Sequence, residues 1–228
     1  MVASEANISL MSVTTPGPDG PGSRLSLALA VTIRHDGHGG VADDLLTPEG
    51  LTAWVRAQAA PPHDAPDAAA FTADAFTADA RALDAVRDLR AAVRTLFART
   101  VRPGPPSRAD AHRLLPEPVA VARLNAAAAL APAAPALHWP PEAGAPVLRS
   151  AVPADLDPAD RLVAALAREA IAFLTGPERA LLRACQGPRC VRYFIKDHPR
   201  QEWCKPSCGN RARVARHHRR HRTEPAAE

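Results

Sequence analysis

Two long segments of the chain repeat apolar residues at the spacing of an α-helix. Between residues 81 and 99 the apolar positions are Leu83, Val86, Leu89, Val93, Leu96 and Phe97. After residue 157 they are Leu162, Leu166, Ala170, Phe173 and Leu174. Each pattern predicts an amphipathic helix, with arginines and aspartates of the first on its solvated side. We expect the two helices to pack together, because each apolar stripe needs a partner.

Shorter patterns predict several smaller elements. Thr47 followed by Pro48 begins a helix that carries Trp54 on its apolar face, and Asp157 caps the long helix from Pro158. Residues 25–29 alternate large and small side chains and suit either a strand or a buried helix. Further short helices are predicted at 107–115, 118–130 and 177–184, and a hairpin at 137–152.

These elements predict a mainly α fold with one small β-hairpin. Trp54 and Trp139 are the expected large anchors, either of the core or of a pocket between helices. The chain is divided into a disordered N-terminus, a helical domain, a C-terminal module with its own separate core, and a tail. The predicted bounds of these parts are 1–23, 24–176, 177–222 and 223–228.

Charge is distributed unevenly between these parts. Residues 178–228 hold 13 basic and 5 acidic side chains, a net charge of +8, whereas the other 177 residues carry −4. Of the 28 basic residues, all but Lys196 and Lys205 are arginine. There is no apolar run of membrane-spanning length and no signal peptide at the N-terminus. We therefore expect a cytoplasmic protein with no membrane contact.

All four cysteines lie close together near the C-terminus, and none precedes them. Cys185 and Cys190 close one short loop, and Cys204 and Cys208 close a second. Two such pairs are typical of a four-thiolate site for one structural zinc ion. Two disulfides, or free and redox-active thiols, are the alternatives, and they require respectively an oxidising compartment and a chance clustering. The spacing favours zinc over both.

The residues around these cysteines resemble a known family. Trp203-Cys204 and Cys208-Gly209-Asn210-Arg211, with the aromatic pair Tyr193 and Phe194 before them, are similar to the CGNR zinc finger. The segment 196–202 departs from the usual pattern of that finger. Upstream, residues 25–56 resemble the start of the ABATE domain, which commonly precedes this finger. The resemblance implies a bacterial regulator of transcription induced by stress.

A basic segment follows the last cysteine and predicts a helix that starts at the metal site. Its arginines are candidates for contacts to nucleic acid: Arg211, Arg213, Arg216, Arg219, Arg220 and Arg222. Three of them, Arg213, Arg216 and Arg220, share one helix face by their spacing. Arginines of this kind contact phosphates and, in a major groove, can also read guanine. A solvated tail that binds nothing is the alternative.

Three functions fit the sequence. The first is a zinc-dependent regulator that binds DNA, whose N-terminal domain senses a small-molecule ligand or a partner, and which could act as a homodimer. The second is an RNA-binding module in which Tyr193, Phe194 and Trp203 stack on bases, although these aromatics could instead pack over the zinc site. The third is a protein-interaction adaptor whose zinc is purely structural.

Other chemistry has little support in the sequence. The chain has no glycine-rich phosphate loop and no serine nucleophile motif, so we expect no catalytic residues and no enzyme activity. His35, Asp36 and His38 lie close together in a glycine-rich segment and could form a second metal site, although a solvated loop is the simpler interpretation.

Overall fold

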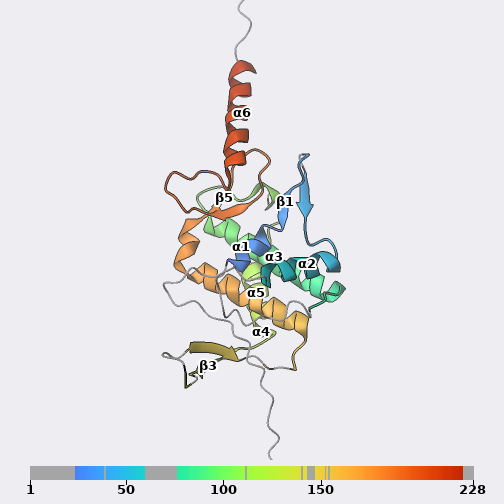
Figure 1. Cartoon of the computed structure of the whole chain (residues 1–228). Coiled ribbons are helices and arrows are strands. Elements are labelled where there is room, and N and C mark those ends of the chain that lie inside the picture. Colours follow the sequence, from blue (N-terminus) through green and yellow to red (C-terminus); the bar gives the residue numbers. More distant parts are fainter. Residues whose placement is uncertain are drawn as a thin grey trace, which may run out of the picture.

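The structure is a computed structural model of the 228-residue chain (Figure 1). It describes residues 24–38, 40–59, 76–110, 112–139, 141–142, 147–151, 153 and 155–222. The predicted disordered N-terminus and the C-terminal tail lie outside these residues. None of the described helices combines the length and the hydrophobicity that crossing a membrane requires.

The described part of the chain is mainly helical, as predicted. Its α-helices are α1 Leu25–Ala30, α2 Pro48–Ala59, α3 Ala80–Thr100, α4 Glu117–Ala129, α5 Pro158–Thr175 and α6 Pro206–Arg222. Two short 3-10 helices are η1 Arg108–Asp110 and η2 Pro177–Leu181. The strands form three antiparallel pairs: β1 Ile33–His35 with β2 Val41–Asp43, β3 Ala134–His138 with β4 Val147–Ala151, and β5 Leu182–Ala184 with β6 Tyr193–Ile195.

The core forms where α3 and α5 pack together, which confirms the prediction from their apolar stripes. The rings of Phe97 and Phe173 meet there with centroids 5.3 Å apart, and α4 packs against both helices. The start of α5 is fixed as expected, because the carboxylate of Asp157 accepts the backbone N–H groups of Ala159 and Asp160.

Two arginines of α3 are buried, which corrects the prediction that the charged side of this helix is solvated. Arg90 is 5% exposed and donates to both carboxylate oxygens of Asp43, at 2.5 and 2.6 Å. Arg94 is 3% exposed and contacts Asp110, equally buried, with 2.7 Å between Nε and Oδ1. These two guanidinium groups turn inward because each meets a carboxylate from another part of the chain, and a buried guanidinium requires an anionic partner.

The hairpin β5–β6 belongs to the core of the helical body. Leu182, Tyr193 and Ile195 are buried in the same apolar cluster as Phe97 and Phe173, and the rings of Tyr193 and Phe97 pack edge to face with centroids 5.5 Å apart. The C-terminal module thus shares the main core through this hairpin, whereas Cys185, Cys190, Phe194 and Cys208 form a small cluster of their own. The expectation of a separate core therefore holds for the cysteine cluster and not for the hairpin. Strands of three residues are too short to give a readable alternation, so the sequence did not reveal this shared packing.

Polar contacts reinforce the same junction. The Tyr193 hydroxyl donates to Oδ2 of Asp110 at 2.7 Å, and the Ser107 hydroxyl donates to the carbonyl of Val191 at 2.8 Å. Burial and the neighbouring Asp110 carboxylate raise the pKa of Tyr193, so this phenol stays protonated and keeps donating. Arg94 lies over the Tyr193 ring, 5.3 Å from its centroid.

Several smaller predictions need revision. The expected helix at 107–115 is reduced to η1, because Asp110 is held inward by Arg94. The expected helix at 177–184 is η2 followed by strand β5. Trp54 packs against the core, but Trp139 is 60% exposed and lies outside the core cluster. The undecided segment at 25–29 is helical, and the predicted hairpin is the pair β3–β4.

Candidate metal centre and basic helix

The two cysteine loops meet between the hairpin β5–β6 and the start of α6. All four sulfur atoms lie within 4.8 Å of one another, and the separations Cys190–Cys204 and Cys204–Cys208 are both 3.6 Å. Three of the cysteines are buried, Cys204 is half-buried, and no disulfide joins them. The structure thus brings together the four residues that the sequence predicts as ligands.

The dimensions of this cluster suit one zinc ion. A tetrahedral ion with Zn–S bonds of ~2.3 Å sets its sulfur atoms ~3.8 Å apart, close to the observed contacts. A disulfide would require a separation of ~2.05 Å. The donor set, four thiols in a compact shell, fits a closed structural zinc site without an open coordination position.

The thiols also depend electrostatically on a cation. Hydrogen bonds from the thiols of Cys185 and Cys204 lower the pKa of Cys190 to about 3. Hydrogen bonds to Cys185 and Cys190 raise the pKa of Cys204 well above its ordinary value. One thiolate is therefore stabilised by its protonated neighbours, and further ionisation places like charges side by side. A bound divalent cation removes this conflict and allows all four thiols to ionise.

Backbone N–H groups and one arginine donate hydrogen bonds to the sulfur atoms, including the N–H of Arg192 to Cys190. Arg211 donates from its guanidinium to Sγ of Cys208 at 3.1 Å, and its Nε donates to the carbonyl of Pro188 at 3.1 Å. The backbone N–H of Cys204 donates to Sγ of Cys185 at 3.5 Å. Arg211 therefore joins the start of α6 to the first cysteine loop and offsets part of the thiolate charge.

Two glycines permit the close packing of the loops. A Cβ atom on Gly187 would lie 2.9 Å from Cβ of Cys208, so a side chain there would separate the two cysteine loops. A Cβ atom on Gly209 would lie 2.9 Å from the Trp203 ring. Sequence reasoning missed Gly187, and its only signal was a glycine between the first two cysteines. Asn210, the next residue of the motif, accepts a hydrogen bond from Arg213.

The aromatic residues of the module pack inward. Tyr193 and Phe194 are 1% and 7% exposed, and Trp203 is half-buried against the cysteine cluster. Packing is therefore the role that the structure gives to this group, and Tyr193 and Phe194 offer no exposed face for stacking on bases. The atypical segment 196–202 closes on itself, since Gln201 accepts the N–H of Asp197 and donates to the carbonyl of Trp203.

Helix α6 projects away from the rest of the protein (Figure 1). Cys208, Gly209 and Ala212 are its buried residues and hold its first turns against the finger. Beyond them the predicted nucleic-acid residues Arg213, Arg216, Arg219 and Arg220 are exposed. Arg222 is the last residue of the helix. Arg211 is the exception among the predicted set, because its guanidinium is engaged at the metal centre.

The second candidate metal group does not assemble. His35 and Asp36 direct polar atoms at their own loop, since Nδ1 of His35 accepts the N–H of Gly37 and Oδ1 of Asp36 accepts that of His38. Within the residues that the structure describes, the cysteine cluster is the one group with metal-binding proximity. The simpler interpretation of this segment, an ordinary loop, agrees with the hairpin β1–β2 that contains it.

Comparison with known families gives two matches in succession along the chain. The family ABATE, described as "Putative stress-induced transcription regulator", matches residues 23–177. The family described as "CGNR zinc finger" matches residues 181–221. Neither description is that of an enzyme family. No curated protein matches the chain.

Proposed function

The chain belongs to the ABATE family and carries a CGNR zinc finger, and we propose that it is a zinc-dependent, DNA-binding regulator of transcription. Zinc held by Cys185, Cys190, Cys204 and Cys208 fixes the base of α6. The arginines of α6 then bind duplex DNA. The helical body, residues 24–176, senses a ligand or a partner and changes how the finger, residues 177–222, is presented.

The observation that carries this proposal is the composition and exposure of α6. Its 17 residues include six arginines and no aspartate or glutamate. A helix about 10–12 Å wide enters the major groove of B-DNA, which is about 12 Å across. Arginines on its surface release counterions when they neutralise phosphates, and this release supplies much of the affinity. The absence of acidic residues from α6 makes a polyanion its natural partner.

The outer half of α6 also has a physical reason to prefer a bound state. From Arg216 to Arg220 every residue is exposed, so this segment has no packed apolar face. Short helices without tertiary packing are marginal in water, and neighbouring positive charges weaken them further. DNA phosphates would remove this repulsion, and we expect the helical content of α6 to rise on binding.

A single finger presents a small surface. One DNA-binding module of this size buries roughly 600–1,000 Å² of protein surface, which limits the affinity for a specific site. We therefore propose that two copies of the chain, or a second contact, share the DNA.

The decisive variant reverses three charges on α6. The R213E/R216E/R220E protein should keep its zinc and bind duplex DNA at least about a hundredfold more weakly in about 0.1 M salt. The salt dependence should become shallower by about 2.7 on the log–log scale if each arginine contacts one phosphate. Fluorescence anisotropy with a labelled duplex over a salt series measures both, and elemental analysis checks the zinc.

The matched control carries the same change in net charge on the helical body. R56E/R87E/R123E alters α2, α3 and α4 and should bind DNA nearly as well as the wild type. Equal loss in both variants would reduce the effect to net charge. Tighter binding to single-stranded RNA than to the duplex would favour an RNA module. No salt-dependent binding of either nucleic acid would favour an adaptor with structural zinc.

A further inference from the structure

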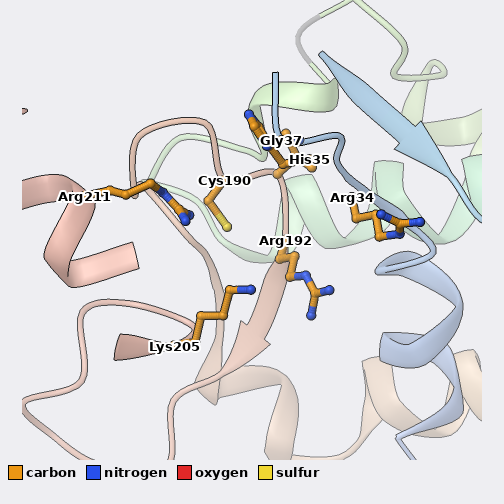
Figure 2. Close-up of a pocket in the computed structure, with 8 residues that line it drawn as sticks. Arg34, His35, Gly37, Cys190, Arg192, Lys205 and Arg211 are labelled. Carbon is orange, nitrogen blue, oxygen red and sulfur yellow. Dashed lines mark hydrogen bonds between the residues drawn. The ribbon is translucent and has the colours of Figure 1, made fainter. Parts of the chain in front are cut away.

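A cavity of about 280 Å³ lies where the hairpin β1–β2 of the helical body meets the zinc finger (Figure 2). Its charged lining residues are Arg34 from β1, Arg192 from the segment before β6, Lys205 from the second cysteine loop and Arg211 from α6. In Figure 2 these side chains surround Cys190 from different parts of the chain, with Arg34 on the side opposite Arg211. Four cations from separate elements thus line one small space.

Among the residues that the structure describes, the charges of Arg192 and Lys205 have no partner. Neither side chain makes a hydrogen bond or an ion pair with any residue in the described ranges. The other two cations are engaged, Arg34 with the carboxylate of Asp44 at 2.6 Å and Arg211 with Cys208. No aspartate or glutamate among the described residues lines the cavity. Two positive charges that line the same cavity repel one another, and an anion bound between them would relieve this repulsion.

The imidazole of His35 in the same wall also has no free acceptor nitrogen. His35 accepts the N–H of Gly37 at Nδ1, so in its neutral form its hydrogen is on Nε2. That Nε2 is buried and has no hydrogen-bond partner among the described residues. Apart from the Cys190 sulfur, which belongs to the zinc cluster, the described side chains of the wall offer a cationic ligand no free acceptor, whereas an oxyanion would meet several donors.

The cysteine cluster does not account for all of this charge. Four thiolates and one zinc ion carry a formal charge of −2, and Arg211 already donates to one of the sulfurs. The side chains of Arg34, Arg192, Lys205 and Arg211 carry a formal charge of +4 together, and Asp44 and the zinc-bound cluster carry −3. One positive charge therefore remains in excess. A second cavity of about 430 Å³ shares Arg192 and Lys205, but its wall includes Asp197, which makes it the poorer anion site.

We propose that the cavity lined by Arg34, Arg192, Lys205 and Arg211 is an oxyanion site that binds a phosphate group. Its volume is at the lower end of the range for small-molecule sites and suits a small phosphorylated compound. A ligand there contacts both the helical body and the finger. The ligand would therefore couple the two parts. If it changes the affinity of the finger for DNA by some factor, DNA must change the affinity of the cavity for the ligand by the same factor.

The test uses the full-length, zinc-loaded chain and inorganic phosphate, titrated calorimetrically against chloride at the same ionic strength. The wild type should bind phosphate, and R192Q/K205Q should bind it at least tenfold more weakly. R200Q is the matched control, because Arg200 is an exposed arginine of the same module outside the cavity. Zinc content and helical signal, measured on each protein, confirm that the variants are folded.

A second titration, with duplex DNA, identifies the source of the phosphate. If free phosphate does not bind, but R192Q/K205Q lowers the salt slope for DNA by about one relative to R200Q, the site holds a backbone phosphate of DNA. Equal behaviour of R192Q/K205Q, R200Q and the wild type in both titrations would overturn the proposal. Phosphate binding is measured without DNA, so failure of the DNA-binding function, tested on α6, is a separate result.

Discussion

The arginines of α3 and those of α6 are the same side chain in opposite circumstances. Arg90 and Arg94 are buried, and each lies against a carboxylate brought from elsewhere in the chain. Arg213 and Arg216 are exposed on a helix that contains no acidic residue. The first pair stabilises the body, and the second group is left available for a partner outside the molecule. An arginine's role is thus set by which anions the fold supplies to it.

Removal of zinc should have the largest effect, and it tests how closely the base of α6 is joined to the body. The hairpin β5–β6 is part of the main core, so Cys208→Ser should lower the free energy of unfolding of the whole chain by several kcal/mol. Structural zinc contributes about 10–16 kcal/mol in isolated finger peptides, which bounds the effect. Urea unfolding followed by circular dichroism measures it, and chelation of the wild type should act in the same direction.

Ser207→Ala is the control for this change, because Ser207 adjoins the ligand and is exposed. A helical signal that unfolds at the same urea concentration in Cys208→Ser and in Ser207→Ala would show that the finger and the body are independent. That result would restore the original expectation of two separate cores.

Loss of Arg94 should have the next largest effect and separates the two classes of arginine. Arg94→Ala leaves the buried Asp110 carboxylate without its cation and should cost about 3–5 kcal/mol of unfolding free energy. Arg99→Ala is the comparison on the same helix, because Arg99 is exposed and pairs with Glu117 at 3.0 Å. An exposed pair of this kind contributes at most about 1 kcal/mol. Similar midpoints for the two variants in urea would contradict the contrast between buried and exposed arginines.

Acid should produce the smallest effect, through Asp43. Burial raises the pKa of this carboxyl, but the hydrogen bonds from Arg90 and from the backbone N–H of Leu45, together with the charges of Arg90 and Arg87, outweigh burial and leave the pKa below the ordinary value. The pair therefore contributes stability above about pH 4, and this contribution is lost as the pH falls through the folded pKa. The urea midpoint of the wild type should fall more steeply between pH 5 and 3 than that of Asp43→Asn.

Asp84→Asn is the control for the acid series, since Asp84 is an exposed carboxylate of α3 with one distant contact to Arg87 at 3.9 Å. It should keep the wild-type pH dependence. If the urea midpoint of Asp43→Asn depends on pH in the same way as that of the wild type and of Asp84→Asn, then the contact between Asp43 and Arg90 does not contribute to acid stability.

The parts of the fold that the sequence predicted are those with local causes. The stripes of α3 and α5, the Asp157 cap and the paired cysteine loops each depend on residues within a few turns of one another. The junction could not be predicted, because Asp110, Ser107 and Tyr193 meet only after folding. Arg94 looked like a surface residue for the same reason, since its carboxylate lies 16 positions away.

The metal centre also has parts that the sequence predicted and parts that it could not predict. Its four sulfur ligands followed from the spacing of the cysteines, whereas the contact of Arg211 with Cys208 was found only in the structure. The contact of Gly187 with Cys208 could not be inferred, because it depends on how one cysteine loop sits upon the other. The same limit applies to the cavity, where Arg34 is more than 150 positions from Arg192 along the chain and meets it only in three dimensions.

Because α6 is attached by its first turns alone, a small rotation at its attached end produces a larger displacement at its free end. With a rise of about 1.5 Å per residue, the 17 residues of α6 form a helix about 25 Å long that is held at one end. A rotation of α6 by about 10° about its attached end would displace its free end by about 4 Å, which is comparable to the rise of one DNA base pair. Small movements in the helical body, without any change of fold, could therefore shift the free end of α6 along DNA by about one base pair.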